Sequence, residues 1–292
     1  MSLRIAFVGT GVMGSSMAGH LLRAGHGVSV HTRTRVRAES LVAAGARWAE
    51  SPAAAADGAD VAISMVGYPT DVAEVWRGPR GFLASAKPGQ ILIDMTTSDP
   101  ALARALAAET AAKGAAALDA PVSGGDRGAR EATLSIMVGG DADAFTRAQP
   151  ILAVMGKSIV LQGGSGTGQL CKLTNQIAIA SGMLAVCEAL AFAKAAGLNP
   201  ETVLSSISGG AAGSWGLSNL APRVLRGDFA PGFYVRHFVK DLGLALETAR
   251  GLGLRLPGLE LAARLYDKVV AAGDADLGTQ ALAKLYFARQ AA

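Results

Sequence analysis

Short apolar runs recur through the first half of the chain, and polar or glycine-containing turns separate them. Runs of about four to eight apolar residues between turn signals are typical of strands buried on both faces of a parallel sheet. They predict strands at residues 3–8, 27–31, 60–66 and 89–97, in the shorter segment AALDAPVSGG that reaches Gly125, and at 134–140 and 157–162. Because a helical pattern follows the first strand, we expect an α/β domain with a doubly wound sheet over residues 1–163.

The pattern changes after the glycine-rich segment 163–168, where strand signals end. The apolar, alanine-rich segment that starts near 168 predicts one long interdomain helix, roughly 42 Å in length at about 1.5 Å per residue. Further helices are expected at 201–208, 215–226, 237–252, 257–272 and 278–290. We therefore predict an all-α domain over residues 164–292. Its long helix exceeds what a small domain can cover, so we expect a homodimer or a homotetramer.

The first predicted strand runs directly into a GxGxxG motif and then into the helical pattern SSMAGHLLRAG. This context makes the motif specific for a dinucleotide site of the Rossmann type, because its glycines allow a tight turn and close approach of a pyrophosphate. The helix N-terminus then offers N–H groups to the anion. A purely structural turn is the alternative. The candidate cofactor-binding residues here are Gly9, Gly11, Val12, Met13 and Gly14.

The end of the second predicted strand, HTRTRVR, bears on which dinucleotide binds. NAD sites usually place Asp or Glu there to accept from the ribose 2′-hydroxyl, whereas the first acid in this chain is Glu39. Hydroxyl and guanidinium groups suit a 2′-phosphate instead. We expect NADP(H) as the preferred cofactor, with NAD(H) also possible, bound by Thr32, Arg33, Thr34 and Arg37. Solvated arginines or a nucleic-acid patch are the alternatives, and the lack of interleaved aromatic residues disfavours nucleic acid.

Composition narrows the class of protein. Half of the 292 residues are hydrophobic, 17% are charged and the net charge is +4, so the chain can fill two cores and carries no strong signal for nucleic acid. No stretch of about 18 uninterrupted apolar residues occurs, so we predict no membrane span. The N-terminal residues lack the pattern of a secretory signal, and a cytoplasmic location is expected. The four histidines show no ligand spacing, so no metal site is indicated.

A polar stripe interrupts the start of the long apolar helix. Gln169, Lys172, Asn175 and Gln176 share one helix face at spacings of three and four residues. Lysine suits proton transfer, because partial burial lowers its pKa towards neutrality, and Asn175 has donor and acceptor groups that could orient it or hold a substrate. A solvated face or an interhelix hydrogen bond is the structural alternative.

A second polar element lies in DAPVSGG, residues 119–125. The hydroxyl of Ser123 and the N–H groups of Gly124 and Gly125 form a small anion-binding concavity that fits a carboxylate. Arg127 and Arg130 lie just beyond and could add positive charge. A tight structural turn is the alternative.

Two further features place chemistry along the chain. Ligands of open α/β sheets bind beyond the carboxyl ends of the strands, so Val66, Thr96 and Ser123 are expected to rim one crevice. Lys240 and Asp241 begin a helical stretch in the second half. By themselves they are typical of a charge pair at the surface, with Asp241 as a solvated partner.

Several segments together resemble one enzyme family, in order along nearly the whole chain: FVGTGVMGSSMA, HTRTRVRAESL, DAPVSGGDRGA, GQLCKLTNQ and FVKDLGLAL. They are similar to the β-hydroxyacid dehydrogenases. This family includes 3-hydroxyisobutyrate dehydrogenases, tartronate semialdehyde reductases and glyoxylate/succinic semialdehyde reductases. The resemblance implies that Lys172 is the catalytic acid/base. It implies that substrate is bound by Ser123, Gly124 and Asn175. It further implies that Val66, Thr96 and Lys240 lie beside the cofactor and that Trp215 and Phe233 close the pocket.

These expectations combine into one predicted activity. The chain is expected to be an NADP-dependent oxidoreductase that reversibly transfers hydride between nicotinamide and a small carboxylate-bearing aldehyde or hydroxyacid. Residues 164–292 then serve substrate binding as well as oligomerisation. Two alternatives stay open. A decarboxylating hydroxyacid dehydrogenase resembling 6-phosphogluconate dehydrogenase needs a larger helical domain, and a non-catalytic NADP-binding module would have no use for Lys172.

Overall fold

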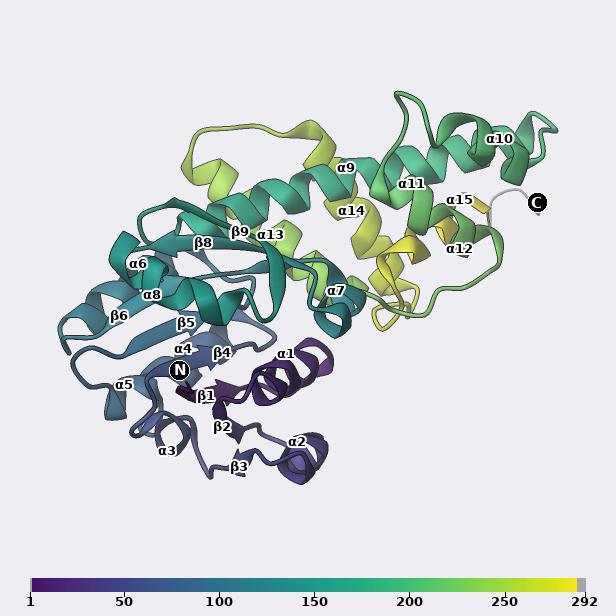
Figure 1. Ribbon diagram of the computed structural model, residues 1–292. Coiled ribbons are helices and arrows are strands. Elements are labelled where there is room, and N and C mark those ends of the chain that lie inside the picture. The colour runs from purple at the N-terminus through teal and green to yellow at the C-terminus, as the bar shows by residue number, and fades with distance from the viewer. Residues whose placement is uncertain (1, 288–292) are drawn as a thin grey trace. The chain divides into compact units, whose positions relative to one another are not determined.

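The predicted strands of the first half form one sheet in the computed structural model, which describes residues 2–287 (Figure 1). Within these residues the sheet has nine strands in the order β3-β2-β1-β4-β5-β6-β8-β7, and β9 pairs with β8. The strands are β1 (Arg4–Val8), β2 (Gly27–His31), β3 (Arg47–Trp48), β4 (Val61–Ser64), β5 (Ile91–Asp94), β6 (Ala116–Asp119), β7 (Val122–Ser123), β8 (Leu134–Gly140) and β9 (Gly156–Gly163). The expected doubly wound sheet is confirmed, because β1 to β6 are parallel and the strand order reverses between β1 and β4.

Helices connect these strands. They are α1 (Val12–Arg23), the 3₁₀ turn η1 (Arg35–Ala38), α2 (Glu39–Ala43), α3 (Pro52–Ala56), α4 (Pro69–Arg77), α5 (Phe82–Ser85), α6 (Pro100–Ala111), α7 (Gly125–Glu131) and α8 (Ala142–Leu152). Local sequence starts several of them. Ser51 and Asp99 each accept hydrogen bonds from backbone N–H groups of the helix that follows, and a proline occupies the first helical position after each of them.

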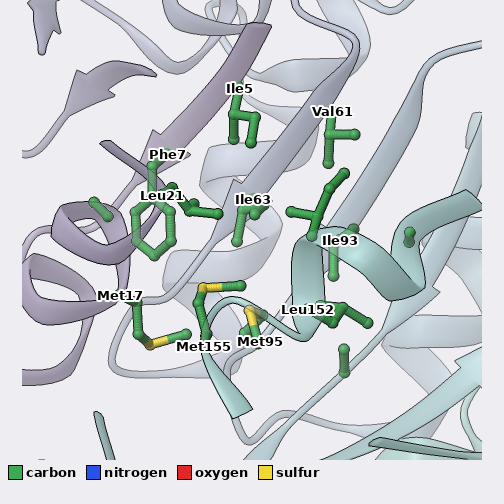
Figure 2. Close-up of a cluster of buried hydrophobic side chains, with 14 of the residues drawn as sticks. Ile5, Phe7, Met17, Leu21, Val61, Ile63, Ile93, Met95, Leu152 and Met155 are labelled. Atoms are coloured by element: carbon green, nitrogen blue, oxygen red, sulfur yellow. The ribbon is translucent and has the colours of Figure 1, made fainter. Parts of the chain in front are cut away.

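The central strands are buried on both faces, as their continuous apolar runs predict. Ile5 and Phe7 of β1 point into one cluster with Met17 and Leu21 of α1, as Figure 2 shows. The alternate residues of β1, Ala6 and Val8, belong to a second cluster with Trp76, Phe82, Leu92 and Leu106. Side chains alternate across a strand, so β1 needs apolar residues at every position.

The segment 116–125 differs from the single strand that its sequence predicts. It forms two short strands, β6 and β7, and both pair antiparallel with β8. Ala120 and Pro121 interrupt them, because proline has no N–H to donate, although the Pro121 carbonyl still accepts from Met137 N at 3.0 Å. The two-residue strand β3 is an addition that no apolar run announces.

Helices make up the second half: α9 (Thr167–Ala195), α10 (Pro200–Ile207), α11 (Trp215–Asn219), α12 (Ala221–Leu225), α13 (Val235–Gly251), α14 (Pro257–Ala271), the 3₁₀ turn η2 (Thr279–Ala283) and α15 (Lys284–Phe287). The predicted helix 215–226 is two short helices, with Ser214 capping the first. The predicted helix 278–290 is a 3₁₀ turn followed by one helical turn, and its residues 288–290 lie outside the described residues. A core of α9, α13 and α14 side chains includes Phe238 and Tyr266, whose rings are 4.9 Å apart.

By its contacts the chain divides into two compact units, Met1–Lys172 and Leu173–Ala292. The division falls inside α9, so the first turns of this helix fold with the sheet and the remainder folds with the other helices. Among the described residues α9 alone is long and apolar enough to cross a membrane. Its buried Gln169, Lys172 and Gln176 and its apolar residues in the core of the second unit are features of a core helix instead.

Candidate active site

The glycine motif is packed as a dinucleotide loop requires. Gly9 has a φ of +100°, and a Cβ there would lie 2.1 Å from the carbonyl oxygen of Met65. A Cβ at Gly14 would lie 1.9 Å from Gly9 O, whereas among the described residues a Cβ at Gly11 would meet no atom within 4 Å. Gly11 is also the N-cap of α1 and caps it with no side chain, while Val12 is exposed. The N–H groups of α1 are therefore accessible to an anion, so these residues fit a dinucleotide pyrophosphate.

The arginines predicted to bind a 2′-phosphate follow the carboxyl end of β2. Arg33 is exposed, and its Nη1 lies 3.0 Å from Asp71 Oδ1. Asp71 also accepts from Tyr68 N at 3.1 Å at the start of α4, so the acid is fixed at a helix end. Thr34 precedes η1, and the exposed Arg37 lies within it. No local sequence pattern marks Asp71, because its contact with Arg33 spans 38 residues.

The ends of β4 and β5 meet through their backbone and side chains. Val66 N donates to Thr96 Oγ1 at 3.0 Å, which brings these two predicted cofactor residues into direct contact. A Cβ at Gly9 would lie 3.1 Å from Val66, so the glycine loop reaches the same place. Ser123 lies on β7, where it pairs with Ser135 of β8. In the sheet, β6 and β8 stand between β5 and β7.

The segment Ser123–Gly125 has a backbone that favours glycine. Gly124 and Gly125 have φ values of +133° and +62°, and α7 starts at Gly125. Arg127 and Arg130, which the sequence places just beyond this segment, both lie on α7. Arg127 pairs with Glu131 at 2.9 Å and Arg130 with Asp126 at 2.6 Å, so both charges are partly neutralised on α7 itself.

The polar stripe of α9 is buried, which excludes the solvated face that its pattern also allowed. The Gln169 and Gln176 side chains are fully buried, and Lys172 is 6% exposed. Asn175, one turn after Lys172, is half-buried, and its Nδ2 donates to Gln176 Oε1 at 2.7 Å. A buried ammonium is costly unless it is paired and hydrogen-bonded.

Two buried side chains of the first unit, Asp119 and Gln169, hold the start of α9; we call them the α9 clamp. Asp119 Oδ1 accepts from Gly166 N at 2.7 Å, and its Oδ2 accepts from Gln169 N at 2.8 Å. Gln169 Nε2 donates to Thr96 O at 2.8 Å, and its Oε1 accepts from Ser98 N at 2.9 Å. Burial raises the pKa of the Asp119 carboxyl, and these backbone donors oppose the rise. In the sequence, Asp119 is marked by its position as a single acid at the end of an apolar strand.

In the second unit the expectation of a surface charge pair is wrong. Asp241 is fully buried, and its Oδ1 lies 2.9 Å from Lys240 Nζ, whose side chain is 13% exposed. Asp241 Oδ2 accepts from Gln176 Nε2 at 2.5 Å. One acid therefore connects Lys240 on α13 to Gln176 and Asn175 on α9, and the buried charge is compensated by a cation and an amide.

The two aromatic residues predicted to close a pocket lie at different depths of the second unit. Trp215 is exposed at the start of α11. Phe233 is partly buried, with its ring 5.9 Å from that of Phe238. Their roles in binding stay predictions.

Two protein-family models match the chain. Residues 4–164 match the model described as the NAD binding domain of 6-phosphogluconate dehydrogenase, and residues 166–286 match the model described as NAD-binding of NADP-dependent 3-hydroxyisobutyrate dehydrogenase. The chain is 54% identical to an uncharacterized oxidoreductase of Bacillus subtilis over 98% of this chain and 99% of the relative. It is 40% identical to the 2-hydroxy-3-oxopropionate reductase of Escherichia coli over 96% of each chain.

A solved structure extends the likeness to the whole fold. A 3-hydroxyisobutyrate dehydrogenase of Mycobacterium tuberculosis, determined with L-serine, superimposes with a TM-score of 0.89 at 34% identity, over 98% of this chain and 99% of that one. The chain thus belongs to the β-hydroxyacid dehydrogenase family, as its motifs predicted. It is an NAD(P)-dependent hydroxyacid dehydrogenase.

Proposed function

We propose that this enzyme reversibly transfers hydride between NADP(H) and a small β-hydroxyacid or the matching semialdehyde acid, with Lys172 as general acid and base. The observation that carries the proposal is the buried Lys172 on α9, one turn beyond a glutamine bonded to the end of β5. In this proposal residues 1–163 bind the dinucleotide, and residues 164–292 contribute to substrate binding and oligomerisation.

The chain's own groups have distinct tasks in the reaction. The bound nicotinamide supplies or takes up the hydride. The Ser123 hydroxyl and the N–H groups of Gly124 and Gly125 hold the substrate carboxylate, at the point where β7 ends and α7 begins. Lys172 Nζ donates a proton to the carbonyl oxygen during reduction and accepts it from the hydroxyl during oxidation. Oxidation needs the neutral amine, so its rate should rise with pH.

Residues of the second unit also have proposed roles. Asn175 binds substrate, and Lys240 lies beside the nicotinamide. Ordered positions of Asn175 and Lys240 support these roles. Buried Asp241 bonds to Lys240 directly, and it bonds to Gln176, which in turn accepts from Asn175. Trp215 and Phe233 are proposed to shield the substrate from water.

The preference for NADP(H) rests on the residues after β2. Arg33, Thr34 and Arg37 follow this strand, and Arg33 forms an ion pair with Asp71 of α4. The remaining N–H donors of Arg33 can bind a 2′-phosphate while Asp71 holds the guanidinium in place.

One assay tests both substrate class and cofactor. Oxidation of NADPH is followed at pH 7 with four aldehydes, and NADH is tested in parallel. The aldehydes are glyoxylate, succinic semialdehyde, tartronate semialdehyde and methylmalonate semialdehyde. The E. coli relative's name points to tartronate semialdehyde, and that of the M. tuberculosis protein to methylmalonate semialdehyde. Faster turnover with NADPH is expected. Faster turnover with NADH would refute the cofactor proposal, and no turnover of any aldehyde would refute the substrate class.

Lys172→Ala is the direct test of the proton-transfer role. General acid–base catalysis contributes about 10²–10⁴-fold to a rate, so kcat should fall by that factor. Binding of NADPH, followed by its fluorescence, should be retained, because the glycine loop is unchanged. A Lys172→Ala enzyme with near wild-type turnover would refute the role.

The oligomer is also part of the proposal. In the second unit, exposed apolar residues line α9, among them Ala178, Ile179, Ala185, Ala189 and Phe192. Such a stripe on a 29-residue helix supports association between copies of the chain.

A further inference from the structure

The position of Lys172 depends on how α9 begins. Lys172 follows Gln169 by one helical turn on the same face, so a tilt or shift of that first turn moves Lys172 with it. The segment before α9 is itself held in the first unit, because Gly163 ends β9 and pairs with Gly139 of β8, and a Cβ at Gly166 would lie 2.8 Å from Pro100 O. The contacts with the sheet must therefore set where α9 starts.

Backbone packing brings α9 against the sheet but leaves its orientation to side chains. A Cβ at Gly168 would lie 2.4 Å from Met137 O and 2.5 Å from Asp119 O, so the helix starts in direct contact with β6 and β8. The α9 clamp then fixes it from two directions. Asp119 binds the N–H groups of the first turn, where the helix dipole favours a negative charge, and Gln169 binds the backbone after β5 at Thr96 and Ser98.

We infer that Gln169, together with Asp119, is a positioning residue for proton transfer by Lys172, an inference that rests on the proposed function. Gln169 is completely buried, and both the nitrogen and the oxygen of its side-chain amide are bonded to backbone. It therefore acts by setting the position of α9 and does not contact the substrate. A displacement of about 1 Å in a reacting group costs on the order of 10²-fold in rate. Loss of the clamp should therefore lower kcat.

The test compares two buried glutamines of the same unit. Gln169→Met removes both side-chain hydrogen bonds and keeps the length of the side chain. Gln90→Met is the matched control, because Gln90 is also buried and its Nε2 donates to Ala56 O at 2.9 Å and Ala59 O at 3.0 Å. Urea unfolding verifies that both variants fold and compares their stabilities. Gln169→Glu, which keeps an acceptor for Ser98 N, serves as a second variant at the site.

The expected result is a split between kcat and cofactor affinity. Gln169→Met should lower kcat by about 10- to 100-fold while the Kd for NADPH changes by less than about threefold. Gln90→Met should keep kcat within about twofold even if its stability falls as much, because the side-chain amide of Gln90 donates to Ala56 O and Ala59 O and not to the residues that hold α9. Gln169→Glu should also lower kcat, because it loses the donor to Thr96 O.

A double variant separates positioning from a general structural effect. If Gln169 acts through Lys172, adding Gln169→Met to Lys172→Ala should not reduce the residual turnover any further. The kcat of the double variant should therefore agree with that of Lys172→Ala within about threefold. A further tenfold loss in the double variant would overturn the inference. So would equal losses in the two glutamine variants, or wild-type kcat in Gln169→Met.

The same set of variants separates this inference from the proposed function. If Lys172→Ala is impaired and Gln169→Met is not, the positioning role alone is refuted. If Lys172→Ala retains wild-type turnover, the proposed proton transfer is refuted, and the positioning role falls with it.

Discussion

Asp94 shows how a single side chain links protonation to folding. It ends the apolar strand β5, and its Oδ1 accepts from Ser64 Oγ at 2.8 Å and from Thr96 N at 3.1 Å. Burial raises its pKa to about 7, and the neighbouring carboxylate of Asp119 on β6 acts in the same direction. The hydrogen bonds from Thr96 and Ser64 offset only part of this rise. Below pH 7 the carboxyl is therefore neutral in the folded protein.

The pKa of Asp94 predicts how stability depends on pH. In the unfolded chain the group ionises near pH 4, whereas in the folded chain its pKa is about 7. Its contribution to the free energy of unfolding should therefore be complete below about pH 4 and be lost as the pH rises to about 7, by at most about 1.4 kcal/mol per unit.

Asp94→Asn tests this at residue scale. Asparagine resembles the neutral acid and cannot ionise, so the variant should lose the Asp94 part of the decrease between about pH 4 and about pH 7. The measurement is urea unfolding at several pH values for both proteins. Parallel stability curves across that range would contradict the predicted ionisation.

At the scale of elements, the crossing of α1 over β1 depends on glycine at one position. Gly14 and Gly19 are both buried in α1, yet a Cβ at Gly14 would lie 1.9 Å from a backbone oxygen, and one at Gly19 would lie 3.3 Å from the flexible end of Arg23. A backbone clash can be relieved only by moving the helix, whereas the arginine can rotate away.

Gly14→Ala should therefore destabilise the first unit by about 1–3 kcal/mol and weaken NADPH binding, because α1 carries the N–H groups that face the pyrophosphate. Gly19→Ala is the matched control and should be neutral or stabilising by up to about 1 kcal/mol, because alanine favours the helix. Chemical denaturation and NADPH titration measure both effects. Similar behaviour of the two variants would show that the close approach at Gly14 is not what limits this position.

At the scale of the whole molecule, the exposed apolar stripe of α9 predicts assembly. Phe192 is 73% exposed, although burying an aromatic side chain contributes about 1.5–3 kcal/mol. Light scattering after size-exclusion chromatography should find the wild type as a dimer or tetramer and Phe192→Glu shifted towards the monomer. Leu252→Glu changes an equally prominent apolar residue at the end of α13 and should leave the mass unchanged. A monomeric wild type would contradict the prediction.

Element types followed from local patterns more readily than element ends did. Continuous apolar runs marked β1, β4 and β5, because a strand covered on both faces needs them. The pattern did not reveal the break at Pro121 or the two-residue β3, because pairing with β8 and β2 defines these strands. The glycine motif and the α9 stripe were also predictable, since each lies within one local segment.

The sequence by itself determined the class of the enzyme, the Rossmann-type sheet, the helical second half and the polar stripe that includes Lys172, because spacing within a strand or helix encodes these features. Only the tertiary structure decided which polar groups are buried together. Asp119 reaches Gln169 across 50 residues and Asp241 reaches Gln176 across 65. No local pattern specifies such contacts, because they form only when the chain has brought distant segments together and removed water from both partners.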